Sequence, residues 1–318
     1  MSLRQSVFRA PVDVDLPHAG TLEVAVEIVA PERPQPIALV CLPGGAMTRR
    51  YYDLLPAHPD ESFSFARQMA ARGFICVLID HLGVGESTRP ADGYALTADI
   101  LAAANAEATE QALTRINNGS AIKDLPPMPD IRSVGVGHSM GAMLTVVQQA
   151  QYPRHAGIAV LGFSTRGLPE YLPPEARALA QDPAAARREV PRLARAMFKE
   201  DYPKIGRTSD GSQLYAGLHA EPAGVEAIKS ARERLLPVPA YHSMLPGNVA
   251  TEAAQVDVPV FVGLGELDMA GPPEDAPKAF TSSPAVELVV LPKTGHSHFI
   301  FAARHELFGR LAQWAGKL

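Results

Sequence analysis

Short apolar runs recur along the chain and alternate with segments of helical spacing. IALVCLP, FICVLID and GIAVLGFS lie in the first half, and VPVFVGLGELD and VELVVLP lie near the C-terminus. Runs of this length without polar alternation are typical of central strands in a parallel sheet covered on both faces. Two longer stretches near the N-terminus, VFRAPVDVDL and TLEVAVEIVA, predict an antiparallel pair.

Helical segments stand between these runs. The segment 97–116 begins with Thr97, a good N-cap residue, and places Leu101, Ala104 and Ala108 on one face. SFSFARQMAARG, MGAMLTVVQQAQY and the terminal FIFAARHELFGRLAQWAGKL also have helical spacing. Strict alternation of strand and helix indicates an α/β fold with a mostly parallel, eight-stranded sheet flanked by helices.

Residues 165–249 have a different character. They are rich in Pro, Ala and Arg, and contain amphipathic pieces such as PAAARREVPRLARAMFKEDY but no buried-strand run. The alternation resumes after them. We therefore predict one core domain formed by residues 1–164 and 250–318, interrupted by an inserted helical cap at 165–249.

Composition narrows the class of protein. Of the 318 residues, 47% are hydrophobic and 20% charged, as in an ordinary globular chain, and the net charge of −5 gives no footprint for nucleic acid. No stretch reaches the length of a membrane helix and the N-terminus has no secretory h-region, so we expect a cytoplasmic protein. Cys41 and Cys76 lie in apolar runs and are expected to be buried hydrophobes. The histidines have no metal-ligand spacing, and neither a metal nor a cofactor is expected.

The segment VGVGHSMGAM has two interpretations. Gly135 and Gly137 could open a phosphate-binding loop, but the third glycine comes one residue late, and the next strand ends without an acidic residue. Gly137-His138-Ser139-Met140-Gly141 instead fits a nucleophile elbow, because it lies between a strand and a helix. We therefore take Ser139 as the candidate nucleophile.

A serine nucleophile needs a base and a carboxylate, and both follow later strands. Asp268 ends the run VPVFVGLGELD, and His296 lies in the loop after VELVVLP. Glu266 is the rival acid, but it lies closer to the strand. His298 is the rival base, but it leads into the helix.

Two backbone N–H groups should stabilise the oxyanion. Met140 follows the nucleophile directly, and the second donor should come from the glycine-rich loop after the run IALVCLP. Gly45 is the first choice in that loop and Ala46 the alternative.

These motifs resemble the α/β-hydrolase fold superfamily, in its serine hydrolase or esterase form with a helical cap. PGGAM, DHLGVGES, GHSMG, GELD and TGHSH carry the resemblance, and the order Ser139, Asp268, His296 is the one that the family requires. By this resemblance Asp80, in DHLGVGES, is structural rather than catalytic. Pro43-Gly44 stands where many relatives have His-Gly.

The resemblance implies hydrolysis of a carboxylic ester or lactone of medium size and largely apolar character, through an acyl-enzyme on Ser139. Tyr51, Tyr52 and His138 are candidate substrate contacts. Thioester or carbon–carbon bond hydrolysis, acyl transfer to an alcohol, and ligand binding without turnover use the same residues and stay open. The expected partner is a small-molecule substrate. Nothing in the residues decides between a monomer and a homodimer formed through the cap or an edge strand.

Overall fold

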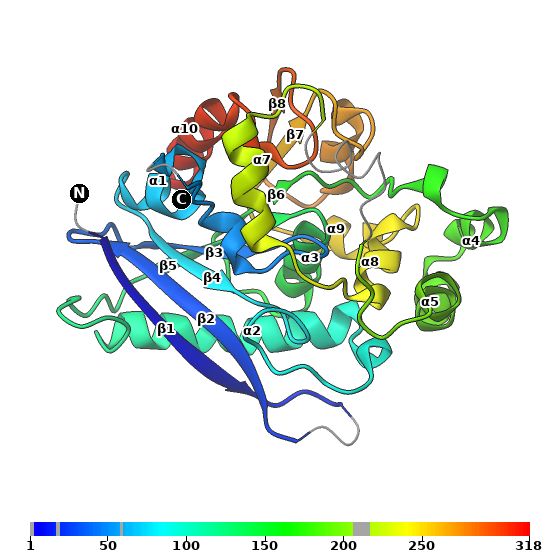
Figure 1. Cartoon of the computed structure of the whole chain (residues 1–318), viewed down its shortest axis with the longest axis horizontal. Helices are drawn as coiled ribbons and strands as arrows, with labels where there is room; N and C mark the ends of the chain where they lie inside the picture. Colours follow the sequence, from blue (N-terminus) through cyan, green and yellow to red (C-terminus); the bar gives the residue numbers. More distant parts are fainter. Residues whose placement is uncertain (1–2, 17–19, 58–59, 206–216) are drawn as a thin grey trace.

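The computed structural model describes residues 3–16, 20–57, 60–205 and 217–318. In this part of the chain, a sheet of eight strands runs through the centre of the molecule (Figure 1) in the order β1-β2-β4-β3-β5-β6-β7-β8. The strands are β1 (Leu3–Val12), β2 (Leu22–Pro31), β3 (Ile37–Leu42), β4 (Ile75–Ile79), β5 (Arg132–His138), β6 (Gly157–Leu161), β7 (Val260–Gly265) and β8 (Val286–Leu291).

Strand β2 is the one strand of this sheet whose direction is opposite to that of the other seven. It pairs antiparallel with both β1 and β4, whereas every pairing from β4 to β8 is parallel. The predicted α/β fold with a mostly parallel eight-stranded sheet is therefore confirmed, as is the antiparallel N-terminal pair. Because parallel strands end at one edge, the loops after β3, β5, β7 and β8 gather there.

Helices cover both faces of the sheet. On one face, α2 (Ala98–Asn117), α3 (Met140–Gln151) and α9 (Ala250–Gln255) share an apolar core with the strands. On the other face, the core is shared with α1 (Phe65–Ala70) and α10 (Arg304–Ala315). Figure 1 shows α2 beneath the sheet and α1 and α10 above it. No helix in these described ranges has the length and apolar character needed to cross a membrane.

Strand β3 illustrates how the apolar runs form the two cores. Ala38 and Val40 face the core with α2 and α3, whereas Leu39 and Cys41 face the core with α1 and α10. A strand with an apolar residue at every position is stable only between two helical layers. Cys41 and the neighbouring Cys76 are fully buried free thiols.

The terminal helix begins later than its sequence pattern predicts. Helix α10 starts at Arg304, and a short 3-10 turn at His298–Ile300 precedes it. Phe299, in this turn, is fully buried and stacks on Phe65 with the ring centroids 5.4 Å apart. Packing of the aromatic ring thus takes this segment out of the helix.

The chain between β6 and β7 forms helices and no strand in its described part. The helices before α9 are α4 (Pro174–Ala178), α5 (Pro183–Phe198), α7 (Pro222–Ile228) and α8 (Pro237–Met244). Helices α4, α5 and α8 share a third, separate apolar cluster that includes Val190, Leu193 and Tyr241. Helix α7 instead packs on the core, where Gly224 lies against Phe63 and Ile300. Figure 1 shows α4 and α5 at the side of the molecule, away from α7.

Arg187 joins α5, in the segment between β6 and β7, to the helices that cover the sheet. From α5 its Nε donates to Asp99 of α2 at 3.1 Å, and another guanidinium nitrogen pairs with Glu252 of α9. The Glu252 side chain is 10% exposed, so its charge depends on this partner more than a surface carboxylate would.

We expect Arg187→Met to loosen the packing of α5 against α2 and α9. Loss of the paired charge should speed protease cleavage within α5 by about ten-fold, which corresponds to about 1.4 kcal/mol. Limited proteolysis followed by mass spectrometry measures the rate. Arg188→Met is the matched control, since Arg188 is the exposed next residue of the same helix. Equal cleavage rates in the two variants would contradict a role for the ion pairs.

Candidate active site

Ser139 lies in a sharp turn between the end of β5 and the start of α3. Its backbone has a φ of 55° and a ψ of −123°, a strained conformation for a residue with a side chain. The flanking glycines leave no room for a Cβ. At Gly137 it would lie 2.4 Å from the Cα of Ala142, and at Gly141 it would lie 2.1 Å from the carbonyl oxygen of Leu42. Close packing therefore explains why both positions are glycine.

The same packing explains Gly135, the other glycine of the phosphate-loop interpretation. A Cβ there would lie 2.8 Å from the Thr145 methyl group and 2.9 Å from the His155 ring. Gly135 and Gly137 thus let α3 approach β5. A nucleotide is not needed to account for them.

Ser139, His296 and Asp268 form one chain of hydrogen bonds at the carboxyl edge of the sheet. The Nε2 atom of His296 lies 2.9 Å from the Ser139 hydroxyl oxygen. Its Nδ1 atom lies 2.8 Å from Oδ1 of Asp268. Asp268 follows β7 and His296 follows β8, so three strand ends bring together residues that are far apart in sequence.

Asp268 also has a second histidine partner. This is His298, which its position in the sequence marks only as a rival to His296 for the role of base. Nε2 of His298 lies 2.8 Å from Oδ2, while the Ala270 N–H donates to Oδ1 at 3.1 Å. Burial alone would raise the pKa of Asp268, but His296 and His298 outweigh burial and hold this pKa well below its ordinary range. The carboxylate is therefore ionised and fully enclosed. In the sequence, the only sign of this second contact is that His298 lies two residues after His296.

Glu266, the rival acid, lies apart from this chain of hydrogen bonds. It is exposed and accepts a hydrogen bond from the Lys293 N–H at 2.8 Å. The adjacent residues His242 and Ser243 also lie outside the chain and do not pair with each other. Nε2 of His242 lies 3.1 Å from the Asn248 carbonyl oxygen, and the Ser243 hydroxyl donates to the Ala240 carbonyl.

The glycine-rich loop after β3 lies close to Ser139. A Cβ at Gly44 would lie 3.2 Å from the Cβ of Ser139. Gly45 lines the cavity above Ser139 together with Met140, whereas Ala46, with a φ of 57°, is not among the lining residues. Met140 opens α3, and the first N–H groups of a helix have no acceptor within it. Gly45 is thus better placed than Ala46 as a second donor.

Backbone hydrogen bonds with residues 231–233 hold this loop in place. The Thr48 N–H donates to the Ala231 carbonyl at 2.8 Å, and the Glu233 N–H donates to the Ala46 carbonyl at 2.8 Å. On the core side, Nε2 of His81 lies 3.0 Å from the Pro43 carbonyl oxygen. The loop is therefore fixed at both ends.

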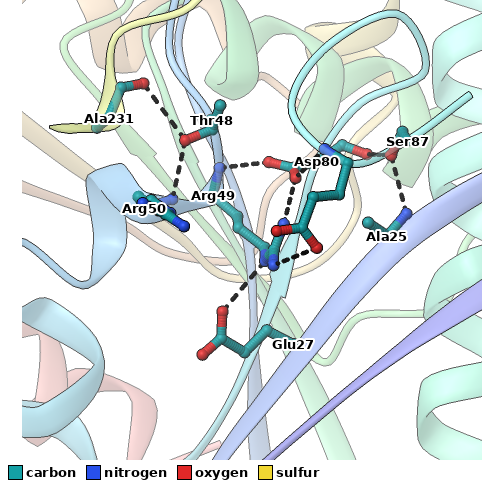
Figure 2. Close-up of polar contacts among 9 residues, drawn as sticks. Ala25, Glu27, Thr48, Arg49, Arg50, Asp80, Ser87 and Ala231 are labelled. Carbon is teal, nitrogen blue, oxygen red and sulfur yellow. Dashed lines mark hydrogen bonds and ion pairs between the residues drawn. The ribbon is translucent and has the colours of Figure 1, made fainter. Parts of the chain in front are cut away.

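Arg49 anchors the end of the loop to DHLGVGES (Figure 2). Its guanidinium pairs with Asp80, with Glu27 at 3.1 Å and with Glu86 at 3.1 Å, and its N–H donates to Asp80 at 2.7 Å. Burial would lower the pKa of Arg49, but Asp80, Glu27 and Glu86 raise it. Asp80 is thereby used in a structural ion pair, in agreement with the role that the family resemblance implies.

A cavity of about 240 Å³ opens above Ser139. Five methionines contribute to its largely apolar wall, and several lining side chains come from the segment between β6 and β7. The lining includes Met47, Met140, Met197, Met244, Met269, Leu168, Phe198, Ile205 and Leu235. Ser139 and His296 belong to the same lining, together with the polar side chains of His138, Ser243 and Ser297.

The predicted substrate contacts of Tyr51 and Tyr52 are wrong. Both side chains are fully buried below the site and neither lines the cavity. The Tyr52 hydroxyl lies 3.0 Å from the carbonyl oxygen of Leu42 and 2.9 Å from that of Val136, so it ties β3 to β5. Tyr51 stacks on Phe299 with the ring centroids 4.8 Å apart. These tyrosines support the site from beneath.

His138 does line the cavity, but its ring is hydrogen-bonded to the main chain of the loop that carries His296. Nε2 lies 2.8 Å from the His296 carbonyl oxygen. Burial, together with His296 and His298, lowers the pKa of His138 well below its ordinary value. The ring is therefore neutral, and its N–H donates to the main chain of the loop that carries His296.

Comparison with known proteins identifies the family and the fold. The model of the alpha/beta hydrolase family matches residues 39–309. A thermophilic esterase from Thermogutta terrifontis, solved with malate bound, is 17% identical with a TM-score of 0.59 over 98% of each chain. A bromoperoxidase from Bacillus anthracis is 15% identical, with a TM-score of 0.60 over 98% of this chain and 100% of its own.

The thioesterase domain from the curacin biosynthetic pathway is also similar. It is 16% identical with a TM-score of 0.55, over 98% of this chain and 99% of its own. No curated protein matches the sequence. The structural neighbours share the fold, and the family match confirms the resemblance drawn from the motifs.

We expect Arg49→Met to lower the free energy of unfolding by about 3 kcal/mol or more, because Asp80 would be left as a buried charge without its cation. Urea denaturation followed by circular dichroism measures this change. Arg50→Met is the control, since Arg50 is exposed, and its effect should stay within about 0.5 kcal/mol. A similar loss in both variants would show that the buried ion pairs do not hold the loop.

Proposed function

The chain belongs to the alpha/beta hydrolase family, and on this premise we propose that it is a serine hydrolase that cleaves a carboxylic ester or lactone. The observation that carries the proposal is the chain of hydrogen bonds from Ser139 through His296 to Asp268. It lies at the base of an apolar cavity, where a substrate carbonyl can reach the serine hydroxyl.

Each residue has a distinct role in the proposed reaction. The Asp268 carboxylate accepts the Nδ1–H of His296, so the lone pair of Nε2 faces the Ser139 hydroxyl. His296 takes the hydroxyl proton as Ser139 attacks the carbonyl carbon, and then returns it to the leaving alcohol. Water activated by the same ring releases the acid from the acyl-enzyme.

The N–H groups of Met140 and Gly45 are the proposed oxyanion donors. Met140 stands at the N-terminal end of α3, where the helix dipole favours negative charge. The backbone pairing of the β3 loop with residues 231–233 fixes the position of the second donor before substrate binds. Donors that are already in place cost no reorganisation during the reaction.

Size and polarity of the cavity indicate the substrate. About 240 Å³ is below the usual range for drug-sized ligands and amounts to about eight water volumes. We propose a short to medium apolar acyl group, enclosed by residues 165–249 acting as the cap. Leu168, Phe198 and Leu235 are the cap residues that would contact it.

A fluorophosphonate probe tests the nucleophile directly. Wild-type protein should gain the mass of one adduct, and Ser139→Ala should gain none, because only an activated serine attacks phosphorus at a useful rate. Intact-mass spectrometry measures the adduct. Ser230→Ala is the control, since its hydroxyl donates to the Ala227 carbonyl far along the chain from the elbow, and it should label like wild type. Folded wild-type protein that takes up no probe would oppose the proposal and favour ligand binding without turnover.

Chain-length preference tests the size of the acyl pocket. We expect kcat/KM for p-nitrophenyl butyrate or octanoate to exceed that for the palmitate ester by about ten-fold or more, since excess methylene groups cannot be buried in the cavity. Phe198→Ala removes a ring from the cavity wall, so it enlarges the cavity and should shift the preference toward longer acyl chains. Tyr171→Ala, at an exposed position, should leave the preference unchanged. A preference for palmitate in wild-type protein would refute the size argument.

A further inference from the structure

The buried carboxylate of Asp268 is divided between two histidines. His296 contacts Oδ1 and His298 contacts Oδ2, both at 2.8 Å. The side chains of Asp268 and His298 are both 0% exposed, so water does not compete for either oxygen. The mechanism proposed above uses only the His296 contact.

We propose that His298 is a positioning residue that sets both the orientation of Asp268 and the share of its charge that acts on His296. This inference rests on the proposed function of the site. His298 does not line the cavity, and its imidazole ring reaches the ring of His296 through the Asp268 carboxylate.

The surrounding packing holds the His298 ring in one orientation. His298 opens the 3-10 turn that precedes α10, and the next residue, Phe299, stacks between Tyr51 and Phe65. With Oδ2 bound to this ring, the carboxylate cannot rotate about its Cβ–Cγ bond without breaking a buried hydrogen bond. Oδ1 therefore stays aligned with Nδ1 of His296.

The second contact also affects the charge that His296 experiences. A hydrogen bond from His298 takes up part of the carboxylate charge, which would otherwise stabilise the protonated and inactive form of His296. A hydrogen bond from His298 reduces the negative charge that acts on His296 whether the His298 ring is neutral or charged. His298 should therefore extend activity toward lower pH.

The other titratable groups packed around this pair do not replace His298. His138 is neutral and donates to the His296 carbonyl, and burial together with the charge of Asp268 raises the pKa of Tyr51 well above its ordinary value. Neither is hydrogen-bonded to Asp268 among the contacts of the described residues. Among the residues that the structure describes, no group of three or more His, Cys, Asp or Glu side chains is arranged to hold a metal ion.

Three variants separate the hydrogen bond from simple packing. His298→Leu fills the space without a donor, His298→Asn is too short to reach Oδ2, and His298→Gln carries an amide N–H near the position of Nε2. We expect Leu and Asn to lower kcat/KM by about ten-fold at the optimum and to move the acid limb of its pH profile up by about one unit. Gln should keep the wild-type limb.

The pH profile decides between positioning and packing. If His298→Leu lowers only the melting temperature while its acid limb stays in place, His298 is structural and the inference fails. If His298→Gln shifts the limb as far as His298→Leu does, the donated hydrogen bond is not the cause, and the inference also fails. Should the Leu variant not fold, the Asn and Gln pair makes the same comparison.

A spectroscopic measurement separates this inference from the proposed function. Proton NMR of wild-type protein should show two far-downfield imidazole N–H resonances, one for each histidine bound to Asp268, and His298→Leu should lose one of them. Two resonances in a protein that neither labels nor turns over esters would overturn the proposed function but keep the shared carboxylate. A single resonance in an active protein would overturn the role of His298 alone.

Discussion

Strand β5, helix α3 and the loop after β3 meet without space between them, and the rest of the candidate site depends on that contact. A side chain at Gly141 would collide with the carbonyl oxygens of Leu42 and Pro43, and one at Gly137 with the backbone of α3. The strained backbone of Ser139 follows from this contact, since the chain must leave the strand and enter the helix within one residue. The distance between the serine and the glycine loop is set at the same time.

Much of this arrangement could be predicted from the sequence because its signals are local. Apolar runs such as β3 mark strands that are buried on both faces, and their parallel arrangement places Ser139, Asp268 and His296 at the same edge of the sheet, after β5, β7 and β8. Glycines at fixed offsets around Ser139 identify the turn. Each inference uses residues that are close in sequence or a rule that holds for parallel sheets in general.

What could not be predicted depends on contacts between distant segments. Tyr51 and Tyr52 follow the glycine loop and looked suited to a substrate, but tertiary packing turns both rings into the core. The terminal helix begins later than its pattern predicts because the ring of Phe299 packs in the same aromatic cluster. His298 illustrates the same limit. Its spacing from His296 was visible, yet only the fold brings its ring onto the far oxygen of Asp268.

The methionine-rich wall of the cavity makes the site sensitive to the chemistry of its surroundings. Thioether side chains are flexible and polarisable, and so adapt to acyl groups of different shape. They are also readily oxidised, and a sulfoxide is polar and chiral where the thioether was apolar. Met197, which is 37% exposed, would meet peroxide before the deeper Met140. Oxidation would therefore change the polarity of the cavity wall while Ser139, His296 and Asp268 stayed chemically intact.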